Sequence, residues 1–256
     1  MTNSRIIIND RKVNLIQYGE GENEVVLLHG WGQNIQMMDY IGQRLINSHI
    51  TILDFPGFGD SEEPKESMNV QEYAEWLAIL LESLQIENPI LIGHSFGGRV
   101  AIKYASMYSV EKVVLLATPC IRHRKKPNLK EKIYKIVKKT PFGEIIRRRV
   151  GSPDYNNATP IMRETLVKVV NEDLLEDAKK ITAPTLIFAG LNDTAVNIED
   201  TYIQANSMLN AAVIEQNGTH YAYLENIDQT AIVINEFIRP QKHSKDECVK
   251  TRCKKK

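Results

Sequence analysis

The feature that most constrains this chain is a serine between two glycines, at the junction of a strand and a helix. The apolar residues 90–92 lead directly into Gly93-His94-Ser95-Phe96-Gly97, and apolar positions at helical spacing follow over residues 100–105. Small residues two positions before and after the serine fit a very tight turn, because the backbone and neighbouring elements crowd it. The pattern predicts an exposed serine at a helix N-terminus. A phosphate-binding loop is the weaker interpretation, because no G-x-x-x-x-G-K-[ST] pattern accompanies the glycines.

Short apolar runs alternate with amphipathic stretches along most of the chain. Residues 6–8 and 13–18 predict an N-terminal hairpin, and residues 70–84 carry apolar side chains at helical spacing. The later runs are apolar throughout, as expected for parallel strands covered on both faces. This alternation predicts an open, mostly parallel α/β sheet, with the functional residues in loops at the carboxyl ends of its strands. The further strands are predicted at residues 25–28, 50–55, 90–92, 113–117, 185–189 and 212–215.

The interval 119–182 interrupts this alternation, because it contains no convincing strand. We therefore expect a helical lid at 119–182, inserted into an α/β core formed by residues 1–118 and 183–240. Residues 241–256 are polar and basic, which predicts a disordered tail. Two apolar stripes at helical spacing support the helical character of the lid: Leu129, Ile133, Ile136 and Val137 in the first, and Met162, Leu166, Val169 and Val170 in the second.

The charges balance overall but are unevenly distributed. The chain has 32 Lys and Arg against 32 Asp and Glu, which argues against a strongly basic nucleic-acid-binding protein. Residues 118–152 nevertheless carry 12 basic and 2 acidic residues, and residues 239–256 carry 8 and 2. The simplest interpretation of the basic lid is a solvated face. The alternative is a surface that attracts an acidic partner, such as an anionic substrate, an acyl carrier protein or an anionic membrane surface.

A serine hydroxyl becomes a nucleophile only with a base, and the base needs a group that orients it. His220 follows the last predicted strand, and Asp193 follows the strand before it. The order Ser95, Asp193, His220, with each residue in a loop at the carboxyl end of a strand, is the order that this architecture requires. We therefore predict these three as catalytic residues. Asp200 or Glu199 could replace Asp193 if the loop folded differently.

The developing oxyanion needs backbone N–H groups close to the serine. His29-Gly30-Trp31-Gly32 follows the strand at 25–28, where an N–H could face Ser95. We predict the N–H groups of Trp31 and Phe96 as the two donors of an oxyanion hole. For His29 we favour a structural role, a hydrogen bond that braces the turn, over a catalytic one.

Together these motifs resemble those of the α/β-hydrolase superfamily. The resemblance implies the α/β-hydrolase fold, with an eight-stranded, mostly parallel sheet flanked by helices, a Ser-Asp-His triad on a nucleophile elbow, and no cofactor. The core is similar to small-ester carboxylesterases, including acyl-carrier-protein methyl ester esterases, and to ring-cleavage-product hydrolases and enol-lactonases. Ser95 argues against the dehalogenases of this superfamily, whose nucleophile is aspartate. The landmarks occur in family order over residues 6–238: His29-Gly30-Trp31-Gly32, Asp54-Phe55-Pro56-Gly57-Phe58-Gly59-Asp60-Ser61, Gly93-His94-Ser95-Phe96-Gly97 and the Asp193/His220 pair.

We therefore predict a serine hydrolase that cleaves carboxylic esters through an acyl-enzyme intermediate. The expected substrate is a small ester or acyl compound. A carbon–carbon bond hydrolase or a lactonase would use the same triad, so both stay open as alternatives. A non-catalytic ligand receptor on this fold is a further alternative, which the intact triad disfavours.

The remaining residues give little sign of metal, disulfide or membrane sites. His243, Cys248 and Cys253 are only three ligands, whereas a structural zinc usually takes four, so we expect no metal. Three cysteines are too few for a disulfide framework, and we expect Cys120 to be a small packed residue at the lid hinge. The longest apolar run, residues 76–81, is too short to cross a bilayer, and residues 1–10 lack the apolar core of a signal peptide. The expectation is a cytoplasmic protein with reduced cysteines.

Overall fold

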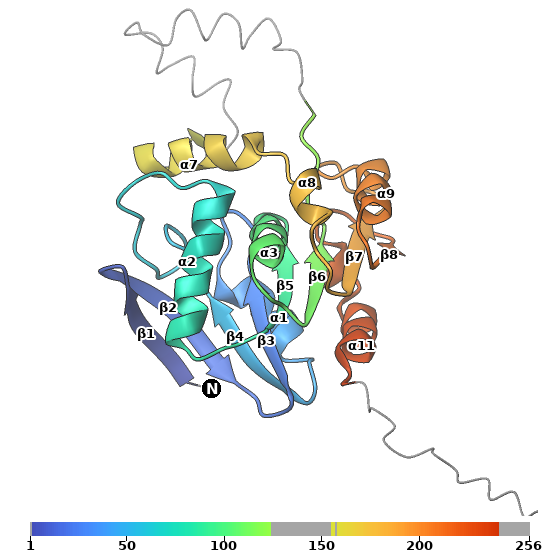
Figure 1. Ribbon diagram of the computed structural model, residues 1–256, viewed down its shortest axis with the longest axis horizontal. Coiled ribbons are helices and arrows are strands. Elements are labelled where there is room, and N and C mark those ends of the chain that lie inside the picture. Colours follow the sequence, from blue (N-terminus) through green and yellow to red (C-terminus); the bar gives the residue numbers. More distant parts are fainter. Residues whose placement is uncertain (1, 124–154, 157, 241–256) are drawn as a thin grey trace, which may run out of the picture.

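The predicted strands pair into one eight-stranded sheet in the computed structural model, which describes residues 2–123, 155–156 and 158–240 (Figure 1). Across the sheet the order is β1-β2-β4-β3-β5-β6-β7-β8. The pairs β1–β2 and β2–β4 are antiparallel and all others are parallel, which confirms the predicted mostly parallel sheet and its N-terminal hairpin. The strands are β1 (Thr2–Ile8), β2 (Arg11–Tyr18), β3 (Asn23–Leu28), β4 (Ser48–Leu53), β5 (Ile90–His94), β6 (Lys112–Leu116), β7 (Thr185–Gly190) and β8 (Ala211–Gln216).

Helices cover both faces of this sheet. Buried side chains of α2, α3 and α8 belong to the core on one face, and those of α1 and α11 belong to the core on the other. In the view of Figure 1, α2 and α3 lie in front of the sheet and α7 lies above α2. The described helices are α1 (Ile35–Gly42), α2 (Val70–Ser83), α3 (Phe96–Met107), α7 (Pro160–Asn171), α8 (Leu175–Ala178), α9 (Ile198–Ser207), α10 (Ala222–Glu225) and α11 (Ile227–Ile238).

Strand β3 shows why the central runs are apolar throughout. Val25 and Leu27 face the core that includes α1 and α11, whereas Val26 and Leu28 face the core that includes α2 and α3. All four side chains have no solvent exposure. Alternate residues of a strand point to opposite faces, so a sheet covered by helices on both sides requires apolar residues at every position.

The interval that we expect to form a lid contains α7 and α8 in its described part. Helix α7 buries Met162, Thr165 and Val169. Residues 160–171 form the helix that the second apolar stripe predicts; Val169, two turns after Met162, is buried, whereas Val170 is 49% exposed. The expected stripe at 129–137, most of the basic residues of 118–152 and the tail at 241–256 lie outside the described residues. No helix within the described part of the chain is long and apolar enough to cross a membrane.

Candidate active site

Ser95 stands at the turn between β5 and α3, in a backbone conformation that few non-glycine residues adopt. Its φ is 50° and its ψ is −107°, and its N–H donates to the carbonyl oxygen of Leu116 over 2.9 Å. A Cβ on Gly93 would lie 2.6 Å from the backbone of Gly97, and one on Gly97 would lie 2.2 Å from the carbonyl oxygen of Leu28. Ser95 is the N-cap of α3, yet its hydroxyl makes no capping hydrogen bond. The turn therefore presents a half-buried hydroxyl at a helix N-terminus.

His220 and Asp193 meet beyond the carboxyl ends of β8 and β7. The Nδ1–H of His220 donates to Oδ2 of Asp193 over 2.7 Å, and the two side chains are 21% and 1% exposed. Oδ1 of Asp193 accepts from the N–H groups of Ala195 (2.7 Å) and Val196 (3.0 Å). Burial alone raises the pKa of Asp193, but the hydrogen bonds from His220, Val196 and Ala195 outweigh it and hold this pKa below its usual value. Asp193 is therefore an ionised carboxylate that orients the imidazole.

The structure distinguishes Asp193 from the alternative acidic residues. Oδ2 of Asp200 lies 2.7 Å from Nε2 of His123, so Asp200 contacts the start of the predicted lid. Glu199 lies in the first turn of α9, where its N–H donates to the side chain of Asn197. Asp193 is the one of these three acids that the structure pairs with His220.

His94 connects the turn that carries Ser95 to the loop that carries His220. Its Nε2 lies 3.1 Å from the carbonyl oxygen of His220, and the centroids of the two imidazole rings are 5.0 Å apart. Burial, and then repulsion from His220, lowers the pKa of His94 to about 3, so its ring is neutral near neutral pH. The predicted nucleophile and the predicted base are therefore held together through the residue that precedes Ser95.

The predicted oxyanion donors lie on two neighbouring segments. Residues 30–33 form a β-turn in which the N–H of Gln33 donates to the carbonyl oxygen of Gly30 over 3.2 Å, and Gly32 has a φ of 71°. The N–H of Trp31 takes no part in the hydrogen bond that closes this turn. Phe96 is the first residue of α3, so its N–H has no intrahelical acceptor. The rings of Trp31 and Phe96 pack edge to face with centroids 5.5 Å apart, which brings the two segments together.

His29 braces the same region, as its structural interpretation predicts. Its Nδ1–H donates to the carbonyl oxygen of Gly30 over 2.7 Å, and the N–H of Phe55 donates to its Nε2 over 3.1 Å. The side chain is fully buried, and burial lowers the pKa of His29 to about 4. Both ring nitrogens are thus engaged with backbone groups. The structural role of His29 is confirmed.

A pocket of about 370 Å³ with both polar and apolar lining opens beside Trp31. Its wall from α7 includes Met162, whose sulfur lies against Gly57, where a Cβ would approach it to 2.4 Å. Glu63 is the charged residue of the lining, and its carboxylate accepts a hydrogen bond from the hydroxyl of Thr159. The lining consists of Trp31, Gly32, Gly57, Phe58, Glu63, Ala158, Thr159 and Met162.

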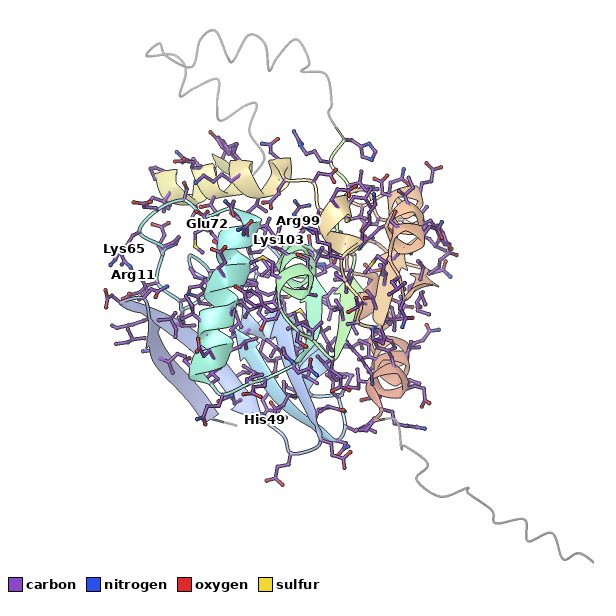
Figure 2. All side chains as sticks on the ribbon, viewed as in Figure 1. Arg11, His49, Lys65, Glu72, Arg99 and Lys103 are labelled. Atoms are coloured by element: carbon purple, nitrogen blue, oxygen red, sulfur yellow. The ribbon has the colours of Figure 1, made fainter. Side chains whose placement is uncertain are left out.

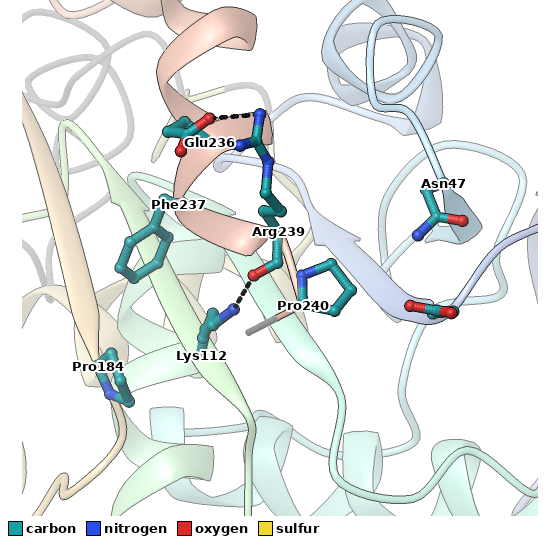
Figure 3. Close-up of a pocket in the computed structure, with 8 residues that line it drawn as sticks. Asn47, Lys112, Pro184, Glu236, Phe237, Arg239 and Pro240 are labelled. Atoms are coloured by element: carbon teal, nitrogen blue, oxygen red, sulfur yellow. Dashed lines mark hydrogen bonds and ion pairs between the residues drawn. The ribbon is translucent and has the colours of Figure 1, made fainter. Parts of the chain in front are cut away.

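A larger pocket, of about 1070 Å³, lies at the opposite edge of the sheet (Figure 3). Lys112, the first residue of β6, donates there from Nζ to the carbonyl oxygen of Arg239 over 3.2 Å. Ser95, in contrast, follows the carboxyl end of β5. In open α/β sheets the functional loops gather at the carboxyl ends, and the smaller pocket includes Trp31, which follows the carboxyl end of β3.

Arg99 is a buried residue near the site that the sequence analysis did not identify. Its guanidinium donates to the carbonyl oxygens of Pro119 (2.6 Å), Val169 (2.9 Å) and Glu172 (2.6 Å). Arg99 therefore ties α3 to both ends of the interval 119–182. Lys103, one turn later on α3, pairs with Asp177 over 2.5 Å, and Figure 2 shows both cations at the end of α3 that faces α7 and α8. Two cations four residues apart, Arg99 and Lys103, lie in a largely apolar stretch of the sequence. This spacing was the signal that could have identified Arg99.

The sequence predicts a packed Cys120 and no metal site, and the structure describes only part of the residues concerned. Cys120 is 2% exposed, which confirms that it is packed. Within the described residues, no group of three or more His, Cys, Asp or Glu side chains has the arrangement to hold a metal ion. His243, Cys248 and Cys253 lie outside those residues.

A family model described as alpha/beta hydrolase fold matches residues 23–143 of this chain, and solved structures of that fold superimpose on nearly all of it. The chain has the α/β-hydrolase fold. One relative, the pimeloyl-[acyl-carrier protein] methyl ester esterase of Proteus mirabilis, is 34% identical over 46% of this chain and 45% of its own. The putative esterase/lipase of Haemophilus influenzae is 24% identical over 93% of this chain and 92% of its own.

Among solved structures, the esterase EaEST from Exiguobacterium antarcticum is similar to this chain with a TM-score of 0.76. The two are 20% identical, and the match covers 93% of this chain and 100% of that one, so the likeness establishes the fold alone. Several curated relatives that are 31–37% identical are matched over only 28–45% of their own length.

Proposed function

We propose that this protein is a serine hydrolase that cleaves carboxylic esters, with Ser95 as the nucleophile, His220 as the base and Asp193 as the group that orients it. The observation that carries the proposal is the positive φ of 50° at Ser95, combined with the 2.7 Å hydrogen bond between His220 and Asp193. A half-buried serine on a tight strand-to-helix turn, next to a residue that contacts the oriented His220, supports nucleophilic catalysis. The named esterases and lipases among the similar proteins support a hydrolase of this class.

The proposed reaction has two half-reactions. Oγ of Ser95 attacks the acyl carbon while Nε2 of His220 takes the hydroxyl proton, and the carbonyl electrons move to the oxygen. The N–H groups of Trp31 and Phe96 donate to this oxyanion, and the N-terminal end of α3 adds a favourable dipole. His220 then gives the proton to the alcohol oxygen, which leaves as the acyl-enzyme forms. A water deprotonated by His220 attacks the acyl-enzyme, and the acid departs while Ser95 regains its proton. Asp193 stabilises the imidazolium in both halves.

The pocket beside Trp31 supports a small substituent on the ester. Its volume of about 370 Å³ is at the lower end of ordinary ligand pockets. Glu63 disfavours an anionic group at this position, because two nearby negative charges repel each other. We further propose that residues 119–182 act as a lid, since Met162 of α7 closes the pocket over Gly57.

The relative from Proteus mirabilis, a pimeloyl-[acyl-carrier protein] methyl ester esterase, supports an ester of an acyl chain as the substrate class. We include an acyl carrier protein as a candidate partner, because residues 118–152 have an excess of ten positive charges in the sequence.

Burst kinetics with a p-nitrophenyl ester test the proposal. We expect a burst of p-nitrophenol equal to the enzyme concentration, followed by slower turnover, and loss of both in Ser95→Ala. Ser106→Ala is the matched control, because Ser106 lies on the same helix and its hydroxyl donates to the carbonyl oxygen of Lys103. Hydrolysis that survives in Ser95→Ala would refute the assignment. A panel of esters, lactones and vinylogous diketones with the same enzyme identifies the bond that is cleaved.

A further inference from the structure

Gln33 closes the turn that carries Trp31. The N–H of Gly30 donates to Oε1 of Gln33 over 3.0 Å, and the backbone N–H of Gln33 donates back to the carbonyl oxygen of Gly30 over 3.2 Å. A Cβ on Gly30 would lie 2.9 Å from Oε1 of Gln33 and 2.7 Å from Nδ1 of His94. The glutamine side chain therefore packs directly against the backbone of the 30–33 turn.

The same side chain reaches the loop that carries the proposed base, by two routes. Directly, Nε2 of Gln33 donates to the hydroxyl of Tyr221 over 3.4 Å. Through His94, Oε1 of Gln33 lies 3.1 Å from Nδ1, and Nε2 of that ring lies 3.1 Å from the carbonyl oxygen of His220. Gln33 and Tyr221 are 188 residues apart in the chain, so these contacts join segments that the covalent chain does not hold together.

The His94 ring is rigidly placed between these groups. It is 1% exposed, and it packs against the rings of His220, Tyr221 and Tyr223 with centroids 5.0, 5.4 and 4.8 Å away. A neutral imidazole has one N–H, so it donates to only one of its two oxygen neighbours at a time. The direct bond from Gln33 to Tyr221 supplies the second link that the neutral ring does not provide.

We propose that Gln33 is a positioning residue that fixes the 30–33 turn relative to His220, so that the N–H of Trp31 and the imidazole act on the same tetrahedral intermediate. This inference rests on the proposed function, since it assigns Gln33 to the machinery of that reaction without contact to the reacting atoms. A shift of the turn weakens the bond to the oxyanion, which forms only in the transition state. Loss of Gln33 therefore lowers kcat more than it changes KM.

Gln33→Met tests this role with a side chain of similar length whose thioether is only a weak hydrogen-bond acceptor. We expect kcat to fall about 10- to 100-fold, because the N–H of Gly30 loses its acceptor and the turn moves. KM should stay within about twofold of the wild type. Gln36→Met is the matched control: Gln36 lies three residues later, on the exposed side of α1, and should retain the wild-type kcat. Stoichiometric labelling of Ser95 by a fluorophosphonate corrects each kcat for the fraction of folded enzyme.

Gln33→Glu adds a second measurement, the pH profile of kcat/KM, which a merely structural role of Gln33 would leave unchanged. The carboxylate still accepts from Gly30, but it places a negative charge beside His94 and close to His220. The titratable groups that already face His220 are Asp193 from the loop after β7, His94 from β5 and Tyr221 next to it. The added charge favours the protonated imidazole, so the acidic limb of the kcat/KM profile should move to higher pH in Gln33→Glu and stay in place in Gln33→Met.

The outcomes separate this inference from the proposed function. A lower kcat in Gln33→Met, combined with the shifted limb in Gln33→Glu, supports the positioning role. If Ser95→Ala is inactive while Gln33→Met matches Gln36→Met, or if the Gln33→Glu profile superimposes on the wild type, the role of Gln33 is refuted and the serine mechanism stands. If Ser95→Ala retains turnover, the proposed function fails and this inference fails with it.

Discussion

Replacing Arg99 by Met should destabilise the protein strongly, because this one side chain satisfies three backbone carbonyls in a buried place. Arg99 is 5% exposed, and the carbonyl oxygens of Pro119, Val169 and Glu172 lie 2.6, 2.9 and 2.6 Å from its guanidinium nitrogens. Leaving a buried acceptor without a donor costs about 1–3 kcal/mol. Burial lowers the pKa of Arg99, so its charged form carries a desolvation cost that methionine removes. We count the lower bound of about 1 kcal/mol for each of the three carbonyls, because the removal of the buried charge offsets part of the cost. We therefore expect the free energy of unfolding to fall by about 3 kcal/mol.

Urea and thermal unfolding measure this loss. For a chain of this length, about 3 kcal/mol corresponds to a fall in Tm of roughly 6–12 °C. Arg44→Met is the control, because Arg44 pairs with Asp228 at the surface, where the side chains are 38% and 84% exposed. An exposed pair contributes less than about 1 kcal/mol. Arg99→Lys keeps the positive charge but lacks the planar guanidinium group. Its loss of stability should therefore lie between those of Arg99→Met and Arg44→Met. If Arg99→Met loses no more stability than Arg44→Met, the reasoning about buried carbonyls is wrong.

The remaining predictions concern pH, ionic strength and the unity of the triad. Burial lowers the pKa of His29 to about 4 and that of His94 to about 3. Both take up a proton more readily in the unfolded chain, so the free energy of unfolding should fall by about 2 kcal/mol per histidine between roughly pH 7.5 and pH 5; a flat urea-unfolding profile would contradict this. Added salt should slow hydrolysis of an anionic or carrier-linked ester and not of a neutral short ester, and equal salt dependence would exclude a role for the basic segment. Removing Ser95 and His220 together should reduce kcat about as much as removing either alone, which additive losses would disprove.

The sheet was predictable because its determinants are local. Apolar runs without alternation mark strands covered on both faces, and each predicted run coincides with a strand to within a few residues. The turn at Ser95 was predictable for a similar reason, since Gly93 and Gly97 are required by contacts within the motif and with the adjoining strand. The pattern also identified His29 as a brace.

The contacts that complete the site depend on residues far apart in the chain. The choice between Asp193 and Asp200 needed the structure, because it rests on which loop reaches His220. Gln33 was not identified, since its partner Tyr221 lies 188 positions away. The spacing of Arg99 and Lys103 marks Arg99 as unusual in an apolar helix, but its acceptors are backbone carbonyls, which no residue type identifies.

The central claim is that Ser95 carries the acyl group during turnover. Mass spectrometry after acid quench of a reaction with p-nitrophenyl trimethylacetate, a hindered ester that deacylates slowly, tests it directly. We expect the intact protein to gain the mass of one acyl group, peptide mapping to place that group on Ser95, and Ser106→Ala to behave like the wild type. Turnover without an adduct on Ser95, or an adduct that persists in Ser95→Ala, would contradict the account.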